Sequence, residues 1–227
     1  MCGRFTLTTP AKQLATLFDH LDDFEIPSQQ PRTNICPTED VLAVRRDADQ
    51  NEAVMLRWGL VPSWAKDIKI GSRMTNARAE TIFEKPSFRS AIKSKRCVIV
   101  TDGFYEWKAI AGRKKKKPFL IARKDKAPWL MAGLWESWQD KQSPDSPPIE
   151  TCTIITTQAN ELLSDLHHRM PVKLEADAMS FWLDHEFRDQ QRLAAIMQPH
   201  PWEGFEISEQ HALSDDNETT RVQKELF

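Results

Sequence analysis

Apolar residues recur at helical spacing near both ends of the chain. Behind a start signal at 8–10, the apolar residues between Leu14 and Leu21 lie three or four positions apart. Residues at that spacing share one face of a helix. The same pattern predicts further short helices over 86–92, 160–166, 176–183 and 189–197.

Short β-branched runs dominate the middle of the chain. The segment 97–100 predicts a buried strand that ends at Asp102-Gly103. A short apolar run bounded by a turn signal is typical of a strand in a core. Similar runs predict strands over 41–44, 54–58, 119–123, 129–134 and 151–157. Proline-rich or aperiodic stretches predict loops at 27–38, 65–82 and 143–148.

The order of these elements predicts the fold class. Strands fill the middle and helices the flanks, which is typical of an α+β domain, here with a β-barrel-like mixed sheet as its core. The chain of 227 residues contains no repeat and no low-complexity linker. We therefore expect a single domain over 1–207, followed by a polar C-terminal tail over 208–227.

The balance of charge argues against nucleic-acid binding through bulk charge. The formal net charge is −2, so any site for a polyanion must be a local patch. Basic residues cluster at 73–78, at 89–96 and in the run 113–117. We interpret the last run as a solvated hairpin tip, the commonest meaning of such a run.

The cysteines and the lack of targeting signals predict a cytoplasmic setting. Cys2, Cys36, Cys97 and Cys152 are widely spaced without a C-x-x-C pair, which disfavours a zinc site or a disulfide framework. No apolar run has membrane-spanning length, and the first residues do not resemble a signal peptide. We expect no metal, no cofactor and no membrane partner.

Cys2 has the most distinctive chemistry in the chain. It directly follows Met1, and aminopeptidases remove Met before small residues, so the mature chain is expected to begin at Cys2. Its α-amine would have a reference pKa of about 7.7–8.0 and be partly neutral near pH 7. Such a 1,2-aminothiol condenses with an aldehyde to an imine, which the thiol closes to a thiazolidine. The alternative is an ordinary small apolar residue.

Two polar segments carry further candidate residues. Asn76, Arg78 and Glu80 alternate along 76–81, so they would share a face of an extended stretch in which an arginine suits a phosphate. Glu106 stands between aromatic residues after the buried strand, where burial raises a carboxyl pKa. Trp107 could stack on a base. The alternatives are a salt-bridged loop and a solvent-facing Glu106.

The segment 166–171 follows a predicted helix and ends at a proline. Histidine carries protons at neutral pH, and we expect adjacent His167 and His168 to point in different directions, so that only one lies in a site. No carboxylate or cysteine stands at metal-ligand spacing. The alternative is that these residues and Arg169 complement a helix dipole.

Taken together, the segments resemble the SRAP (SOS-response-associated peptidase) family. The resemblance extends to about residue 205, and shorter stretches at 34–38, 132–135 and 156–160 fit its pattern too. Residues 208–222 depart from it, since they lack the expected Val-rich strand and following Asn. The matching segments, in order, are Met1-Cys2-Gly3-Arg4-Phe5, Trp58-Gly59-Leu60-Val61-Pro62-x-Trp64, Asn76-Ala77-Arg78-Ala79-Glu80-Thr81, Gly103-Phe104-Tyr105-Glu106-Trp107 and His167-x-Arg169-Met170-Pro171.

This resemblance implies a protein that senses abasic sites in single-stranded DNA and crosslinks to them through its N-terminal Cys. It implies a cytoplasmic monomer, associated with the nucleoid when bound to DNA. Cys2 matches the nucleophile, and the other active-site positions match Asn76, Glu106 and His167. Phosphate contacts match Arg4, Arg78 and Arg169, with Thr156 as a further nucleic-acid contact. Positions near the bases match Pro37, Trp64 and Trp107.

The chemistry of the residues and the resemblance agree. An abasic deoxyribose is in equilibrium with a ring-opened aldehyde, which is a substrate for an aminothiol. Glu106 would exchange a proton with the sugar oxygen, His167 would carry protons at the imine, and Asn76 would hold the Cys2 amine.

Two other functions remain open. One is a cysteine peptidase, including the autopeptidase proposed for the family, that uses Cys2 with His167 and Glu106. It requires an acyl substrate and oxyanion donors. The other is a non-catalytic binder of modified DNA, which needs no nucleophile.

Overall fold

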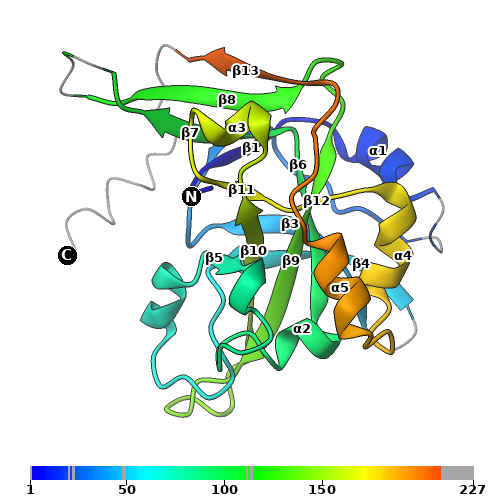
Figure 1. Ribbon diagram of the computed structural model, residues 1–227. Helices are drawn as coiled ribbons and strands as arrows, with labels where there is room; N and C mark the ends of the chain where they lie inside the picture. The colour runs from blue at the N-terminus through cyan, green and yellow to red at the C-terminus, as the bar shows by residue number, and fades with distance from the viewer. Residues whose placement is uncertain are drawn as a thin grey trace.

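Two β-sheets form the centre of the structure, with short helices around them (Figure 1). The computed structural model describes residues 2–19, 21, 24–47, 50–110, 112 and 115–210. One sheet has five strands in the order β13-β8-β7-β1-β2, all paired antiparallel. Its strands are β1 Phe5–Leu7, β2 Arg32–Ile35, β7 Gly103–Lys108, β8 Lys117–Arg123 and β13 Phe205–Glu209.

The other sheet has eight strands and closes on itself. They run in the order β11-β10-β4-β3-β6-β9-β12, with β5 beside β10, and β10 pairs with β9 as well. β10 is parallel to β4 and β5 but antiparallel to β9 and β11. The ring β10-β4-β3-β6-β9 confirms the predicted barrel-like mixed sheet. The strands are β3 Asp40–Asp47, β4 Gln50–Trp58, β5 Asn76–Arg78, β6 Arg96–Thr101, β9 Trp129–Trp138, β10 Ile149–Gln158, β11 Arg169–Pro171 and β12 Lys173–Leu174.

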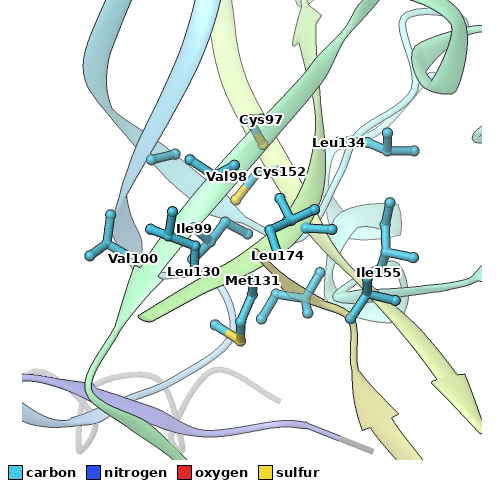
Figure 2. Packing of buried hydrophobic residues seen from close by; sticks show 14 of the residues in the cluster. Cys97, Val98, Ile99, Val100, Leu130, Met131, Leu134, Cys152, Ile155 and Leu174 are labelled. Carbon is cyan, nitrogen blue, oxygen red and sulfur yellow. The ribbon is translucent and has the colours of Figure 1, made fainter. Parts of the chain in front are cut away.

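The ring is packed with aliphatic side chains and buried thiols. Figure 2 shows Cys97 of β6 and Cys152 of β10 together with Ile99 and Met131. All positions of β6 are buried, as expected of a strand that is covered on both faces. Burial raises the pKa of the Cys97 and Cys152 thiols, so both are neutral, inert core residues.

Short helices cover the sheets, and among the described residues none is long and apolar enough to cross a membrane. The α-helices are α1 Ala11–Leu14, α2 Ala91–Ser94, α3 Glu161–Ser164, α4 Ala176–Leu183 and α5 Gln190–Ile196. Three 3-10 helices, η1 Ala15–Phe18, η2 Ile68–Arg73 and η3 Ala79–Thr81, lie in the connections.

Arg96 is an internal structural residue rather than part of a surface patch. Its side chain is 2% exposed. Its Nε donates to the Trp182 carbonyl at 2.6 Å and its Nη1 to the Ile92 carbonyl at 2.8 Å. Burial lowers its pKa to about 10. One guanidinium thus ties α2 and the end of α4 to the barrel, and the basic cluster expected at 89–96 loses this member.

Gly59 and Gly71 make a close backbone contact that explains the glycine of the 58–64 segment. Gly59 has φ +132°, and a Cβ there would lie 2.6 Å from the Gly71 carbonyl oxygen. Its N–H donates to the Cys152 carbonyl at 2.8 Å. The chain leaving β4 can therefore pass beside η2 only where both residues lack a side chain.

Replacing Gly59 by alanine is expected to destabilise the fold by about 3 kcal/mol, because a strained positive φ and a backbone overlap act together. Gly204→Ala is the matched control. Gly204 also has a positive φ, +75°, but apart from its chain neighbours no atom of the described residues lies within 4 Å of its Cβ position, so only about 1 kcal/mol is expected. Equal losses in urea denaturation of the two variants would contradict the contact.

The helix over 176–183 and the strands of the ring are confirmed, but two loop predictions are wrong. The segment 27–38 contains β2 and the segment 65–82 contains β5. These short strands form because they pair with distant partners, as Phe5 with Ile35 and Asn76 with Ile154. The helix over 86–92 begins only at Ala91.

The last strand departs from expectation as well. β13 pairs with β8 from Phe205 to Glu209, so the chain forms a strand across the predicted boundary at 207. Residues 211–227 of the predicted tail lie outside the described part of the chain.

Candidate functional site

The N-terminal segment is held against β7 of the five-stranded sheet. Phe5 pairs with Phe104, and the Tyr105 N–H donates to the Arg4 carbonyl at 2.9 Å. The antiparallel register continues toward the terminus, which places the first residues opposite Glu106. Cys2 is 1% exposed. Its thiol pKa is raised by burial and by the negative charge of Glu106.

Asn76 fixes the position of Cys2. Its Nδ2 donates to the Cys2 carbonyl oxygen at 2.8 Å, which sets the orientation of the amide because a carbonyl only accepts. Asn76 was expected to hold the Cys2 amine. The hydrogen bond instead joins Asn76 to the carbonyl oxygen of Cys2. Its Oδ1 is buried and accepts no hydrogen bond from the described residues, which leaves an acceptor for a reacting group.

Glu106 is a buried carboxyl, which decides between the buried and the solvent-facing Glu106 that the sequence left open. It is 4% exposed, and its pKa is raised by burial, which outweighs the opposing positive charge of His168. A carboxyl with a raised pKa exchanges protons closer to neutrality. Glu106 therefore has the electrostatic character of a general acid or base.

His167 lies in the turn between α3 and β11. Burial lowers its pKa, although a hydrogen bond with Arg169 opposes this effect. The Arg169 N–H and carbonyl oxygen lie 2.9 and 3.2 Å from His167 Nδ1, so Arg169 donates to this nitrogen in one tautomer and accepts from it in the other. The rings of His167 and His168 stack, with centroids 4.4 Å apart and 24° between planes. The expectation that they point in different directions is wrong.

Arg169 is anchored within the wall of the site. It is 7% exposed, and Nη1 and Nη2 reach the two Glu80 carboxylate oxygens at 2.6 and 2.9 Å. Burial alone would raise the Glu80 pKa, but this fork lowers it. Arg169 Nη2 also donates to the carbonyl of Thr156 at 2.5 Å. Thr156 is fully buried, so it would act on a ligand through Arg169.

A cationic pocket of about 470 Å³ opens beside these residues. Arg78, from β5, is exposed there, in contrast to Arg169. The planar, positively charged guanidinium of Arg78 suits a phosphate group. The lining residues are Arg78, Gln158, Ala159, Ser164, His168 and Arg169.

Arg4 is connected to both β2 and β7. Its Nη1 donates to Asn34 Oδ1 at 2.9 Å, and its guanidinium carbon lies 5.9 Å from the Trp107 ring centroid. Pro37 is half-buried in the turn after β2. Trp64 is 53% exposed.

The described contacts join Cys2 to Asn76 by a hydrogen bond and to Glu106 electrostatically, and they place His167 beside Arg169 and His168. The strands β5 and β7, which carry Asn76 and Glu106, can be followed in Figure 1. Sequence reasoning missed Asn34 as the partner of Arg4 and His168 as part of the pocket. Within the described ranges, no group of His, Cys, Asp or Glu residues is arranged to hold a metal.

The sequence and the fold are both similar to those of known proteins. The model of the SOS response associated peptidase (SRAP) family matches residues 1–212. The abasic site processing protein YoaM of Bacillus subtilis is 44% identical over 206 residues, covering 91% of this chain and 89% of YoaM. The abasic site processing protein HMCES of Pongo abelii is 32% identical over 260 residues, covering 94% and 72%. A solved structure from Bacteroides thetaiotaomicron has a TM-score of 0.79 and 26% identity, covering 92% and 91%.

Proposed function

The chain belongs to the SRAP family, and from that premise we propose that it recognises abasic sites in single-stranded DNA and crosslinks to them as a thiazolidine. The nucleophile is Cys2 after removal of Met1. The observation that carries the proposal is the Asn76–Cys2 hydrogen bond of 2.8 Å, which holds residue 2 beside buried Glu106. Relatives named as abasic site processing proteins supply the substrate class.

The reaction needs no cofactor. The Cys2 amine adds to the aldehyde carbon of the open abasic sugar, and the carbinolamine loses water to give an imine. The thiol sulfur then adds to the imine carbon, and its proton goes to the nitrogen. The balance is one aldehyde and one aminothiol in, and one thiazolidine and one water out.

Glu106 and His167 are proposed to move the protons. Ring opening requires proton exchange at the sugar oxygens, and a carboxyl whose pKa is raised by burial suits this step. Burial lowers the pKa of His167, so its neutral ring can exchange a proton with a leaving hydroxyl near neutral pH. Asn76 Oδ1, buried without a partner among the described residues, can accept a hydrogen bond from the attacking amine.

The thiol environment favours this function over a cysteine peptidase. A peptidase thiol attacks a separate acyl group and needs a lowered pKa, whereas burial and Glu106 raise that of Cys2. In thiazolidine closure the thiol attacks a carbon already bonded to its own residue. Effective molarities of about 10⁵–10⁸ M make a depressed pKa unnecessary there.

Denaturing electrophoresis of the protein with single-stranded DNA that carries one abasic site tests the proposal. A band shift that survives denaturation is expected, together with an intact mass showing loss of Met1. The same DNA with an intact base, or with its abasic aldehyde reduced by borohydride beforehand, is the control. A missing shift, or a shift from protein that fully retains Met1, would overturn the mechanism.

A further inference from the structure

The β7–β8 hairpin extends past the site and carries a dense set of cations. Glu106 pairs with Phe119, and the last pair before the turn is Lys108 with Lys117. Lys108 is two strand residues, about 7 Å, beyond Glu106. The run 113–117 is entirely basic. The proposed proton carrier and the basic turn are thus parts of one hairpin (Figure 1).

Most of the described hairpin cations are not neutralised by acidic groups. Lys117 forms an ion pair with Glu209. Lys115 and Lys116 are exposed and Lys108 is half-buried, and none of the three has an ion-pair partner within the described part of the chain. A solvated turn does not need several positive charges without acidic partners beside a binding site.

The charge of the tip also acts on His167, in the turn between α3 and β11. Burial is the main cause of the lowered pKa of His167, and the positive charge of Lys116 adds to it. His167 in turn contacts Arg169, which lines the cationic pocket. The positive charge of the hairpin tip therefore reaches a residue that is hydrogen-bonded to pocket-lining Arg169.

We propose that Lys108, Lys115 and Lys116 form a second phosphate-binding surface, which holds the DNA backbone outside the abasic nucleotide. This inference rests on the proposed function and adds a substrate requirement to it. The pocket lined by Arg78 binds phosphate near the lesion, whereas the hairpin binds the strand one or a few nucleotides away. The basic run predicted to be a solvated tip thus becomes a determinant of substrate length.

The test is the salt dependence of binding by the full-length double variant Lys115→Ala/Lys116→Ala. With undamaged single-stranded DNA of about 20 nucleotides, each lost phosphate contact lowers the slope of log affinity against log salt by roughly 0.7, or roughly 1.4 for both. With a trinucleotide that has one central abasic site, wild type and variant are expected to crosslink at equal rates.

A matched control changes net charge equally. Lys12 on α1 and Lys93 on α2 are exposed helix residues away from the hairpin (Figure 1), and Lys12→Ala/Lys93→Ala should retain the wild-type slope. An unchanged slope in the hairpin variant, or an equal drop in the control, would overturn the inference. If wild type crosslinks neither the abasic trinucleotide nor longer abasic DNA, the proposed function fails. In that case, a lower salt slope of the hairpin variant on undamaged DNA still supports the binding surface.

Discussion

Cys2→Ala protein is expected to form no adduct that survives denaturing electrophoresis. The variant keeps an α-amine after Met1 removal, so it can still form an imine, which borohydride would trap. It lacks the sulfur that closes the ring. Because intramolecular closure has effective molarities of about 10⁵ M and above, millimolar free thiol cannot replace it, and the yield of stable crosslink should fall more than about 10³-fold.

The control for this prediction is Cys36→Ala. Cys36 is a half-buried cysteine just after β2 that forms no disulfide, and its loss should leave the crosslink intact. Cys2 is buried, so melting temperatures of both variants must accompany the assay; a loss of about 1 kcal/mol is ordinary for such a truncation. A stable, unreduced adduct from Cys2→Ala would show that the product is not a thiazolidine.

Glu106→Gln is expected to slow single-turnover crosslinking by about 10²–10⁴-fold, the usual contribution of a positioned acid or base. Glutamine preserves shape and hydrogen bonding but cannot exchange a proton. Affinity for undamaged DNA should stay nearly unchanged. The pH profile of the wild-type rate should contain an inflection that is absent from the Glu106→Gln profile. This inflection should lie above the ordinary carboxyl pKa of about 4.3, because burial raises the pKa of Glu106.

Stability should change in the opposite direction to activity. A carboxyl whose folded pKa exceeds its unfolded value binds its proton more tightly in the folded state. Its contribution to stability is therefore present below about pH 4.3 and is lost as pH rises through the folded pKa. At a pH above the folded pKa of Glu106, Glu106→Gln removes a buried charge, so its free energy of unfolding should equal or exceed that of wild type.

Glu136→Gln is the control for Glu106→Gln, because it also neutralises a buried glutamate. Glu136 is 6% exposed and forms an ion pair with Lys95, away from Cys2. Its neutralisation should lower stability, because Lys95 loses its partner, and should leave the crosslinking rate of folded protein unchanged. A normal rate in well-folded Glu106→Gln would remove Glu106 from the mechanism.

Sequence patterns predicted the barrel because its strands are long and apolar. β6 and β10 are buried along almost their entire length, and such runs are legible without knowledge of their partners. β2, β5 and β11 were not predicted as strands. Each is only three or four residues long, and their extended conformation comes from pairing rather than from local propensity.

The same distinction holds for the site. The residue types at Cys2, Glu106 and His167 indicated their chemistry, because an aminothiol, a carboxyl among aromatics and a histidine have characteristic reactivity. The atom that Asn76 uses, the Glu80 fork that anchors Arg169 and the stacking of His168 could not be predicted. The first two depend on contacts between segments 74 and 89 residues apart, and the stacking of His168 on His167 depends on the conformation of the turn, none of which composition and spacing encode.

The position of β10 in the ring bears on when the protein becomes reactive. β10 pairs with β4 and β9 to close the barrel, and its far end carries β5 with Asn76 and β11 with Arg169. Cys2 leaves the ribosome first, yet the strand that organises its partners is made roughly 150 residues later. Closing so long a loop is slow. The nascent chain would therefore carry an aminothiol without its proton carriers, and rapid crosslinking would begin only when folding is complete.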